Sequence, residues 1–189
     1  MRALALALGL LTSTSALAEN DRVWTPWYLP RYALAGFVSS INSGSTFSVE
    51  ARLGWEITLI DQRTNMVALL ELGPAFGVST PAAVERLYQH TVVAGVGLRP
   101  GRHRKVQWGA SLLFGAMLYG AHVPGLPPPY DYDQQLDGLL EGRVHVGLNL
   151  GPLALAAYFG VSQIWYVNVR KTSAPYVGGL SFGFLVDWR

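Results

Sequence analysis

Apolar and polar residues alternate along a segment in the first third of the chain. From Phe47 to Leu59 every second residue is apolar, and the residues between them include Glu50, Arg52 and Glu56. This period of two over 13 residues is typical of a β-strand, whereas apolar positions in a helix recur every three to four residues. We therefore expect a strand with one apolar face and one charged face.

Two later segments repeat the alternation. From Leu140 to Leu150, apolar residues and glycine alternate with a second set that contains Glu141, Arg143 and His145. From Leu180 to Trp188, large apolar residues occupy every second position. Alternating segments of about ten residues separated by turn residues are the sequence pattern of outer-membrane β-barrels.

Eight such segments predict an all-β fold, an eight-stranded antiparallel transmembrane up-and-down β-barrel. The predicted strands are 31–42, 46–60, 66–78, 87–99, 106–122, 135–150, 153–165 and 176–188. Pro74 removes a backbone donor from the third strand, so we expect a β-bulge there. We also expect Gln163 to break the alternation of the seventh strand.

The predicted connections indicate an orientation. At one end they are the short segments 61–65, 100–105 and 151–152. At the other end they are 42–45, 79–86, 123–134 and 166–175, three of which are longer. Outer-membrane barrels have short periplasmic turns and longer external loops, so we expect both termini to be periplasmic.

Composition supports an exported membrane protein. Half of the 189 residues are hydrophobic and 14% are charged, below the roughly 25% of an ordinary soluble domain. A net charge of +2 gives no reason to expect nucleic-acid binding. The chain has no cysteine, and its four histidines are scattered without metal-ligand spacing, so we expect no metal and no cofactor.

Residues 1–18 have the pattern of a secretory signal peptide. A positive start at Arg2 precedes an apolar run, and Ala16 and Ala18 match the A-x-A cleavage pattern. Cleavage there leaves 19–30 as a short periplasmic segment and 31–189 as the barrel. No later segment has the about 20 apolar residues that a membrane helix needs, which leaves the closed barrel as the spanning structure.

This architecture, together with the closing strand Leu180–Trp188, resembles the small eight-stranded outer-membrane barrels of the outer-membrane protein A type. The resemblance covers nearly all of 31–189 and implies a location in a bacterial outer membrane. It implies outer-membrane lipid, lipopolysaccharide and the barrel-insertion machinery as partners. Such barrels commonly end on an aromatic residue, whereas here Arg189 follows Trp188. The chain ends with the barrel, so we expect no periplasmic domain.

The inward face predicts a plugged lumen, since an eight-stranded barrel holds only its own side chains or one small ligand. The expected ion-pair network consists of Glu50, Arg52, Glu56, Glu71, Glu141, Arg143 and His145. Buried charges need partners, and we expect Arg143 to bridge Glu56 and Glu71. Inward glycines leave room for arginine and tyrosine side chains. A proton or ion path is the alternative interpretation.

Aromatic residues near the strand ends predict girdles at the two membrane interfaces. We expect Tyr32, Trp108 and Trp188 to point outward at the periplasmic rim, and Phe47, Tyr88 and Trp165 at the outer rim.

The connection 123–134 contains the candidate contact residues Pro127, Pro128, Pro129, Tyr130 and Tyr132. Consecutive prolines favour a stiff polyproline segment, and tyrosine offers a large contact area with few rotatable bonds. We expect a contact site for a surface protein partner here; a solvated loop without a partner is the alternative.

The sequence therefore favours a non-enzymatic outer-membrane barrel that contributes to envelope integrity or surface contact. One alternative is a lipid-modifying enzyme resembling a lipopolysaccharide acyl hydrolase, which needs a serine beside a histidine. None of the four histidines is followed by serine two residues later, so we assign no catalytic residue. The other alternative is a soluble lipocalin-like periplasmic carrier, which would place its apolar face inside and lysine outside; the chain has only Lys105 and Lys171.

Overall fold

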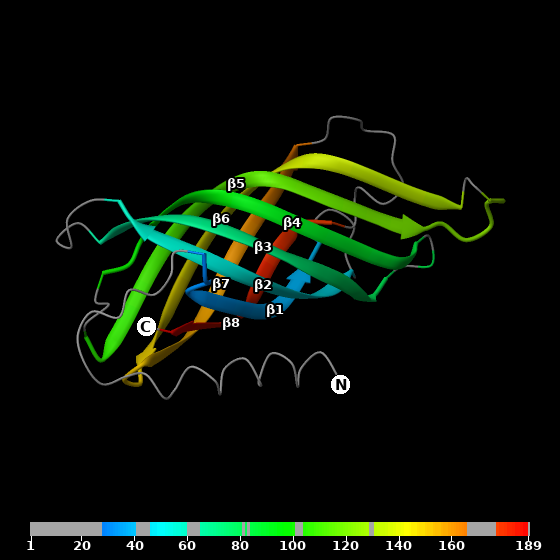
Figure 1. The fold of residues 1–189 in the computed structure, drawn as a ribbon. Coiled ribbons are helices and arrows are strands. Elements are labelled where there is room, and N and C mark those ends of the chain that lie inside the picture. Colours follow the sequence, from blue (N-terminus) through cyan, green and yellow to red (C-terminus); the bar gives the residue numbers. More distant parts are fainter. Residues whose placement is uncertain are drawn as a thin grey trace.

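The chain forms a closed barrel of eight antiparallel strands (Figure 1). This computed structural model describes residues 28–40, 46–59, 65–80, 82, 84–100, 104–128, 131–165 and 177–188. The strands are β1 (Tyr32–Ser39), β2 (Phe47–Thr58), β3 (Met66–Ser79), β4 (Glu85–Leu98), β5 (Val106–His122), β6 (Tyr132–Asn149), β7 (Leu153–Trp165) and β8 (Gly179–Trp188). Each strand pairs with the next, and β8 pairs with β1, which confirms the predicted all-β up-and-down topology.

Within these residues, no helix has the length and apolar character needed to cross a membrane.

The strand ends differ from the predicted ones by a few residues. β6 begins at Tyr132, earlier than expected, because the β5–β6 hairpin stays paired as far as His122 and Tyr132. β8 begins at Gly179, later than expected, because Gly178 and Gly179 adopt positive φ values that turn the chain into the strand.

Two predicted irregularities are wrong. The register between β2 and β3 is the same on both sides of Pro74, and the shift lies instead at Phe47 and Ser48. Gly73 allows this, because its missing side chain lets the Ala51 backbone of β2 approach closely. Gln163 keeps its outward place in the unbroken alternation of β7, and its side-chain amide donates to the backbone oxygen of Ile164 at 3.2 Å.

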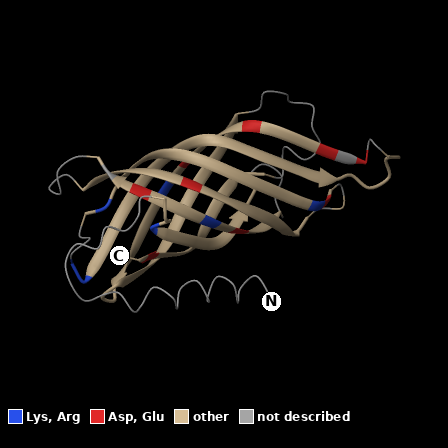
Figure 2. Ribbon diagram, viewed as in Figure 1, with Lys and Arg blue, Asp and Glu red and all other residues tan. Residues whose placement is uncertain are grey.

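Side chains divide between the two faces of the wall by alternation along each strand, most regularly in β1 and β7. The outward face is a belt of exposed apolar residues, which includes Phe37, Leu53, Phe114, Val146 and Phe184. Most of the ribbon carries no charged residue (Figure 2). The carboxylates and guanidiniums of the strand interiors are buried, so they lie in the lumen.

The outward belt includes several of the predicted girdle residues. Trp108, Phe47 and Trp165 are exposed on the wall, as expected. Tyr32 is a correction, because it is fully buried and points into the lumen.

The two ends of the barrel differ in their connections. At the terminal end, where β1 begins and β8 ends, the connections are 59–65, 99–105 and 150–152. At the opposite end, which we refer to as the loop end, they are 40–46, 80–84, 123–131 and 166–178. Only the last two of these exceed the connections of the terminal end, so the expected difference in loop length rests on two loops rather than three. The β5–β6 hairpin projects furthest from the barrel (Figure 1).

Candidate functional site: the barrel interior

Five charged side chains from three strands meet in the lumen. β2 contributes Glu50 and Arg52, β3 contributes Glu71, and β6 contributes Glu141 and Arg143. Each is at most 5% exposed. We refer to these five residues as the central cluster.

The two arginines join carboxylates that come from different strands. Arg143 donates to both oxygens of Glu71, at 2.7 and 2.8 Å, and its Nε donates to Glu141 at 3.1 Å. Arg52 contacts Glu50 at 2.8 Å and Glu141 at 2.7 Å, and lies 3.6 Å from Glu71. A guanidinium presents five donors in one plane, which suits it to bridge two carboxylates. The central cluster therefore ties β2, β3 and β6 together across the lumen.

Two tyrosines complete the hydrogen bonding of the glutamates. The Tyr32 hydroxyl donates to Glu71 Oε1 at 2.6 Å, and the Tyr158 hydroxyl donates to Glu50 Oε1 at 2.6 Å. The Tyr32 ring crosses β2 at Gly54, where an added Cβ would overlap the ring. Here an inward glycine makes room for a tyrosine.

Sequence reasoning missed both tyrosines, for different reasons. On β1, Tyr32 and Leu34 face inward and Ala35 and Phe37 face outward, so both faces are apolar and the alternation gives no phase. Tyr158 could have been found, because its inward neighbours on β7 are small or polar residues such as Ala156 and Ser162.

A second group of charges lies nearer the terminal end. Arg99 contacts Glu56 at 2.9 Å and Asp187 at 3.1 Å, and its guanidinium carbon lies 4.7 Å from the centre of the Tyr32 ring. We refer to Arg99, Glu56 and Asp187 as the rim cluster. Tyr32 links the two clusters, since its ring faces Arg99 and its hydroxyl faces Glu71.

The rim cluster corrects the expected partner of Glu56. The register places Leu69 opposite Glu56 and Gly54 opposite Glu71, so the two glutamates are not paired across β2 and β3. Arg143 bridges Glu71 and Glu141 instead, and Glu56 pairs with Arg99.

His145 is buried on the same face of β6 as Glu141 and Arg143. Its ring packs over Gly109, which lies opposite it on β5. No ion pair between His145 and a carboxylate occurs within the described part of the chain. Space left by a glycine, rather than a charge partner, therefore accounts for its position.

Toward the loop end, the lumen is filled by polar and apolar side chains. Gln89 donates to Ser48 at 3.2 Å, and Tyr119 and Gln135 donate to Asp137 at 2.6 and 2.7 Å. Buried apolar side chains pack at this end; they are Val84, Leu87, Ala121, Ile164 and Val177. Side chains thus occupy the lumen along its length.

The candidate contact residues fall only partly within the described structure. Pro127 and Pro128 are exposed at the tip of the β5–β6 hairpin. Pro129 and Tyr130 lie outside the described residues. The backbone of Tyr132 pairs with His122, while its side chain is also outside the description.

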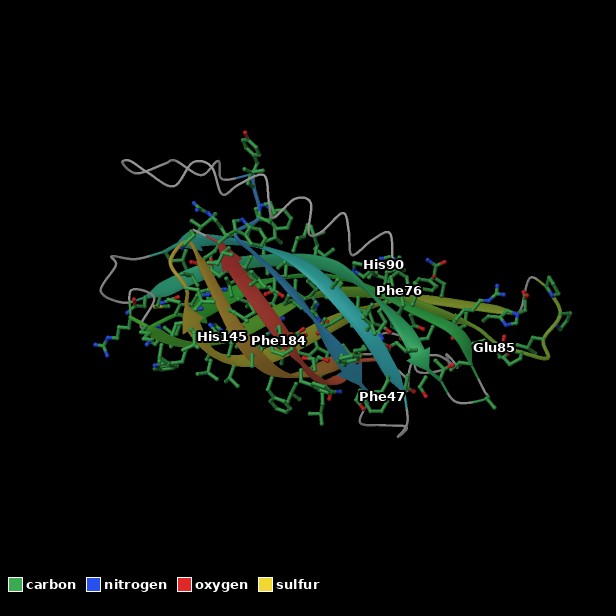
Figure 3. The ribbon with its side chains drawn as sticks, turned by 90° about the horizontal axis from the view of Figure 1, so that it is seen from below. Phe47, Phe76, Glu85, His90, His145 and Phe184 are labelled. Carbon is green, nitrogen blue, oxygen red and sulfur yellow. The ribbon has the colours of Figure 1, made fainter. Side chains whose placement is uncertain are left out.

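The remaining described histidines lie away from the lumen. His90 is exposed on the wall, with Phe76 at 6.4 Å and Tyr88 at 5.7 Å between ring centres (Figure 3). His122 lies 3.3 Å from Glu85 and 3.6 Å from Asp131. Across the residues that the structure covers, no three His, Asp or Glu side chains are grouped to hold a metal ion. A hydrolase would need a serine beside a histidine. On β5, Ser111 lies opposite Arg143, and the residue opposite His145 is Gly109.

These observations define a class: a closed eight-stranded barrel with an apolar outer wall and a lumen filled by ion pairs and tyrosines. The sequence matches no family model, and no curated protein matches it. Among solved structures, the chain is similar to the crystal structure of Neisserial surface protein A. That similarity has a TM-score of 0.60 and 15% identity, and it covers 84% of this chain and 95% of that one. The two proteins therefore share a fold.

Proposed function

We propose that this chain is a non-enzymatic integral protein of a bacterial outer membrane, a barrel plugged by its own side chains. It would contribute to envelope integrity, or to surface contact through the loops of one end. The observation that carries this proposal is the division of the wall: exposed apolar residues cover the outside, while charged residues are paired inside. In water such a belt would be an aggregation hazard, whereas in lipid it is the stable arrangement.

The similarity to Neisserial surface protein A supports the same proposal through the fold alone. The division of the wall argues against a soluble carrier, which would need its apolar residues inside. The packed interior argues against an enzyme that acts within the lumen, since a lipid acyl chain could not enter it.

Membrane insertion is tested by expressing the full chain in a Gram-negative host and separating its membranes. We expect the protein in the outer-membrane fraction, with a gel mobility that changes on heating, because closed barrels resist unfolding by detergent. Recovery in the soluble periplasmic fraction would contradict the proposal.

The plug is tested by electrical recording from the purified protein in a planar lipid bilayer. The central and rim clusters fill the lumen with side chains from β2, β3, β6 and β8 and with Arg99, which directly follows β4, so we expect no steady conductance. Stable open-channel currents from the wild-type protein would overturn this part of the proposal and favour the ion path.

Orientation is tested by labelling intact cells with an impermeant amine reagent, followed by peptide mass analysis. Lys171 lies in the 166–178 connection of the loop end, and Lys105 lies at the terminal end. We expect label at Lys171 and none at Lys105. Label at Lys105 alone would show the opposite orientation, in which the tip of the β5–β6 hairpin is not at the cell surface.

A further inference from the structure

The barrel is closed by the pairing of its first and last strands. β1 and β8 pair from Tyr32 and Asp187 at one end to Ser39 and Leu180 at the other. This pairing joins the elements that are furthest apart in the chain, whereas all other pairings join consecutive strands. Closing the longest loop costs the most chain entropy, so the β1–β8 seam is the pairing that most needs extra stabilisation.

The Tyr158 side chain crosses this seam on the inside of the barrel. Tyr158 lies on β7 opposite Gly183 of β8; Gly183 lies opposite Gly36 of β1, and Gly36 lies opposite Glu50 of β2. The Tyr158 hydroxyl donates to Glu50 at 2.6 Å. The side chain thus passes over both seam strands and joins β7 directly to β2.

The two glycines make this passage possible. A Cβ added to Gly36 would overlap the Tyr158 hydroxyl and would lie 2.9 Å from Gly183 Cα. A Cβ added to Gly183 would lie 2.5 Å from Gly36 Cα. A side chain at either position would push the tyrosine off the wall or separate the two strands.

Both ends of the contact are held by the central cluster. The guanidinium carbon of Arg143 lies 5.4 Å from the centre of the Tyr158 ring, and Arg52 contacts Glu50 at 2.8 Å. A hydrogen bond to a charged acceptor is stronger than one between neutral groups, and it is strongest where water is excluded.

We propose that Tyr158 is a strap that fastens the β1–β8 seam from the lumen, and that Gly36 and Gly183 leave the space that its side chain occupies. Tyr158 and Glu50 come within reach of each other only when β8 and β1 are paired. The hydrogen bond therefore stabilises the closed barrel and contributes nothing while the seam is open.

The test is hydrogen–deuterium exchange of backbone amides in the folded full chain in detergent micelles. Tyr158→Phe removes only the hydroxyl. We expect exchange in β1 and β8 to accelerate about tenfold, equivalent to about 1.4 kcal/mol, with little change in β4 and β5. The matched control is Tyr119→Phe, because the Tyr119 hydroxyl donates to Asp137 at the same 2.6 Å but joins the neighbouring strands β5 and β6. That variant should leave β1 and β8 unchanged.

A second measurement applies if Tyr158→Phe does not fold. The chain has no cysteine, so two introduced cysteines can form a disulfide that cross-links one chosen pair of strands. Ala35 and Phe184 face each other across the seam, and Ala94 and Phe114 face each other across β4 and β5. We expect a cross-link at the first pair, and not at the second, to restore folding. Equal restoration of folding by the two cross-links would overturn the proposal. So would a folded Tyr158→Phe variant whose amide exchange is unchanged, or is accelerated equally in all strands.

Discussion

Arg52 and Leu53 are neighbours on β2, yet their side chains meet opposite surroundings. Arg52 enters the lumen and contacts Glu50 and Glu141. Leu53 faces outward and is 42% exposed. The same contrast recurs on β5, where Leu113 is fully buried and Leu112 is exposed.

This contrast shows that the two faces are specified in different ways. In the proposed membrane location, an outward side chain needs only to be apolar, since lipid tails are as apolar as leucine and offer no particular shape. An inward charged side chain needs a specific partner of opposite charge, because a buried charge without one is strongly destabilising. Substitutions should therefore be judged by polarity outside and by charge and shape inside, and four experiments test this.

The largest effect is expected from Arg143→Met. This change removes the bridge between Glu71 and Glu141 and strands buried carboxylates, at a cost of about 3–5 kcal/mol in the free energy of unfolding. Reversible urea unfolding in lipid vesicles measures it. The double variant Arg143→Met with Glu71→Gln should recover part of the loss. An Arg143→Met protein as stable as wild type would show that the central cluster does not hold the barrel together.

A charge on the outward face comes next. Leu53→Arg or Val146→Arg should lower the free energy of unfolding in vesicles by about 2–4 kcal/mol if the site lies near the middle of the bilayer. The control is Leu53→Met, which keeps the site apolar and should change little. Equal stabilities for the arginine and methionine variants would mean that this face does not contact lipid.

Adding a methyl group at an inward and at an outward glycine tests the effect of shape without a change of polarity. Gly54→Ala places a methyl group against the Tyr32 ring and should cost about 1–3 kcal/mol by overpacking. Gly142→Ala is the matched outward change, because a Cβ there meets nothing within 4 Å, and it should stay within about 0.5 kcal/mol of wild type. Adding Tyr32→Leu to Gly54→Ala should relieve the clash, and an additive loss in that double variant would argue against it.

The smallest effects should come from the two leucines of β5. Leu113→Ile changes shape in the packed lumen and should cost up to about 1.5 kcal/mol. Leu112→Ile changes an exposed side chain of the outward face and should stay within about 0.5 kcal/mol. Thermal unfolding of both variants in one lipid composition compares them, and a larger loss at Leu112 would reverse the assignment of the faces.

Alternation in the sequence predicted which way most side chains point. It succeeded on β2, β6 and β8, where one set of positions is mostly apolar and the other is mostly polar or small. It failed for Tyr32, because both faces of β1 are apolar: the inside of the barrel at this strand is packed with Leu34 and Val38. A period of two locates a face only when the two faces differ in polarity.

Partners across the lumen could not be predicted in the same way. The inward direction of Glu56, Glu71, Glu141 and Arg143 followed from alternation, but the contacts among them depend on strand register and on the distance across the barrel. Glu71 lies opposite Gly54 of β2, two residues before Glu56. Glu56 pairs with Arg99, whereas Glu71 pairs with Arg143.

The sequence alone therefore determined the eight strands, the apolar wall and the charged interior, because each depends on residue polarity at a spacing of two. Only the tertiary structure decided which charges pair and where the barrel is fastened. Tyr158 and Glu50 are 108 residues apart, and nothing local to either predicts their contact. They meet because closure of the barrel places β7, β8, β1 and β2 side by side, with glycines on the two strands between them.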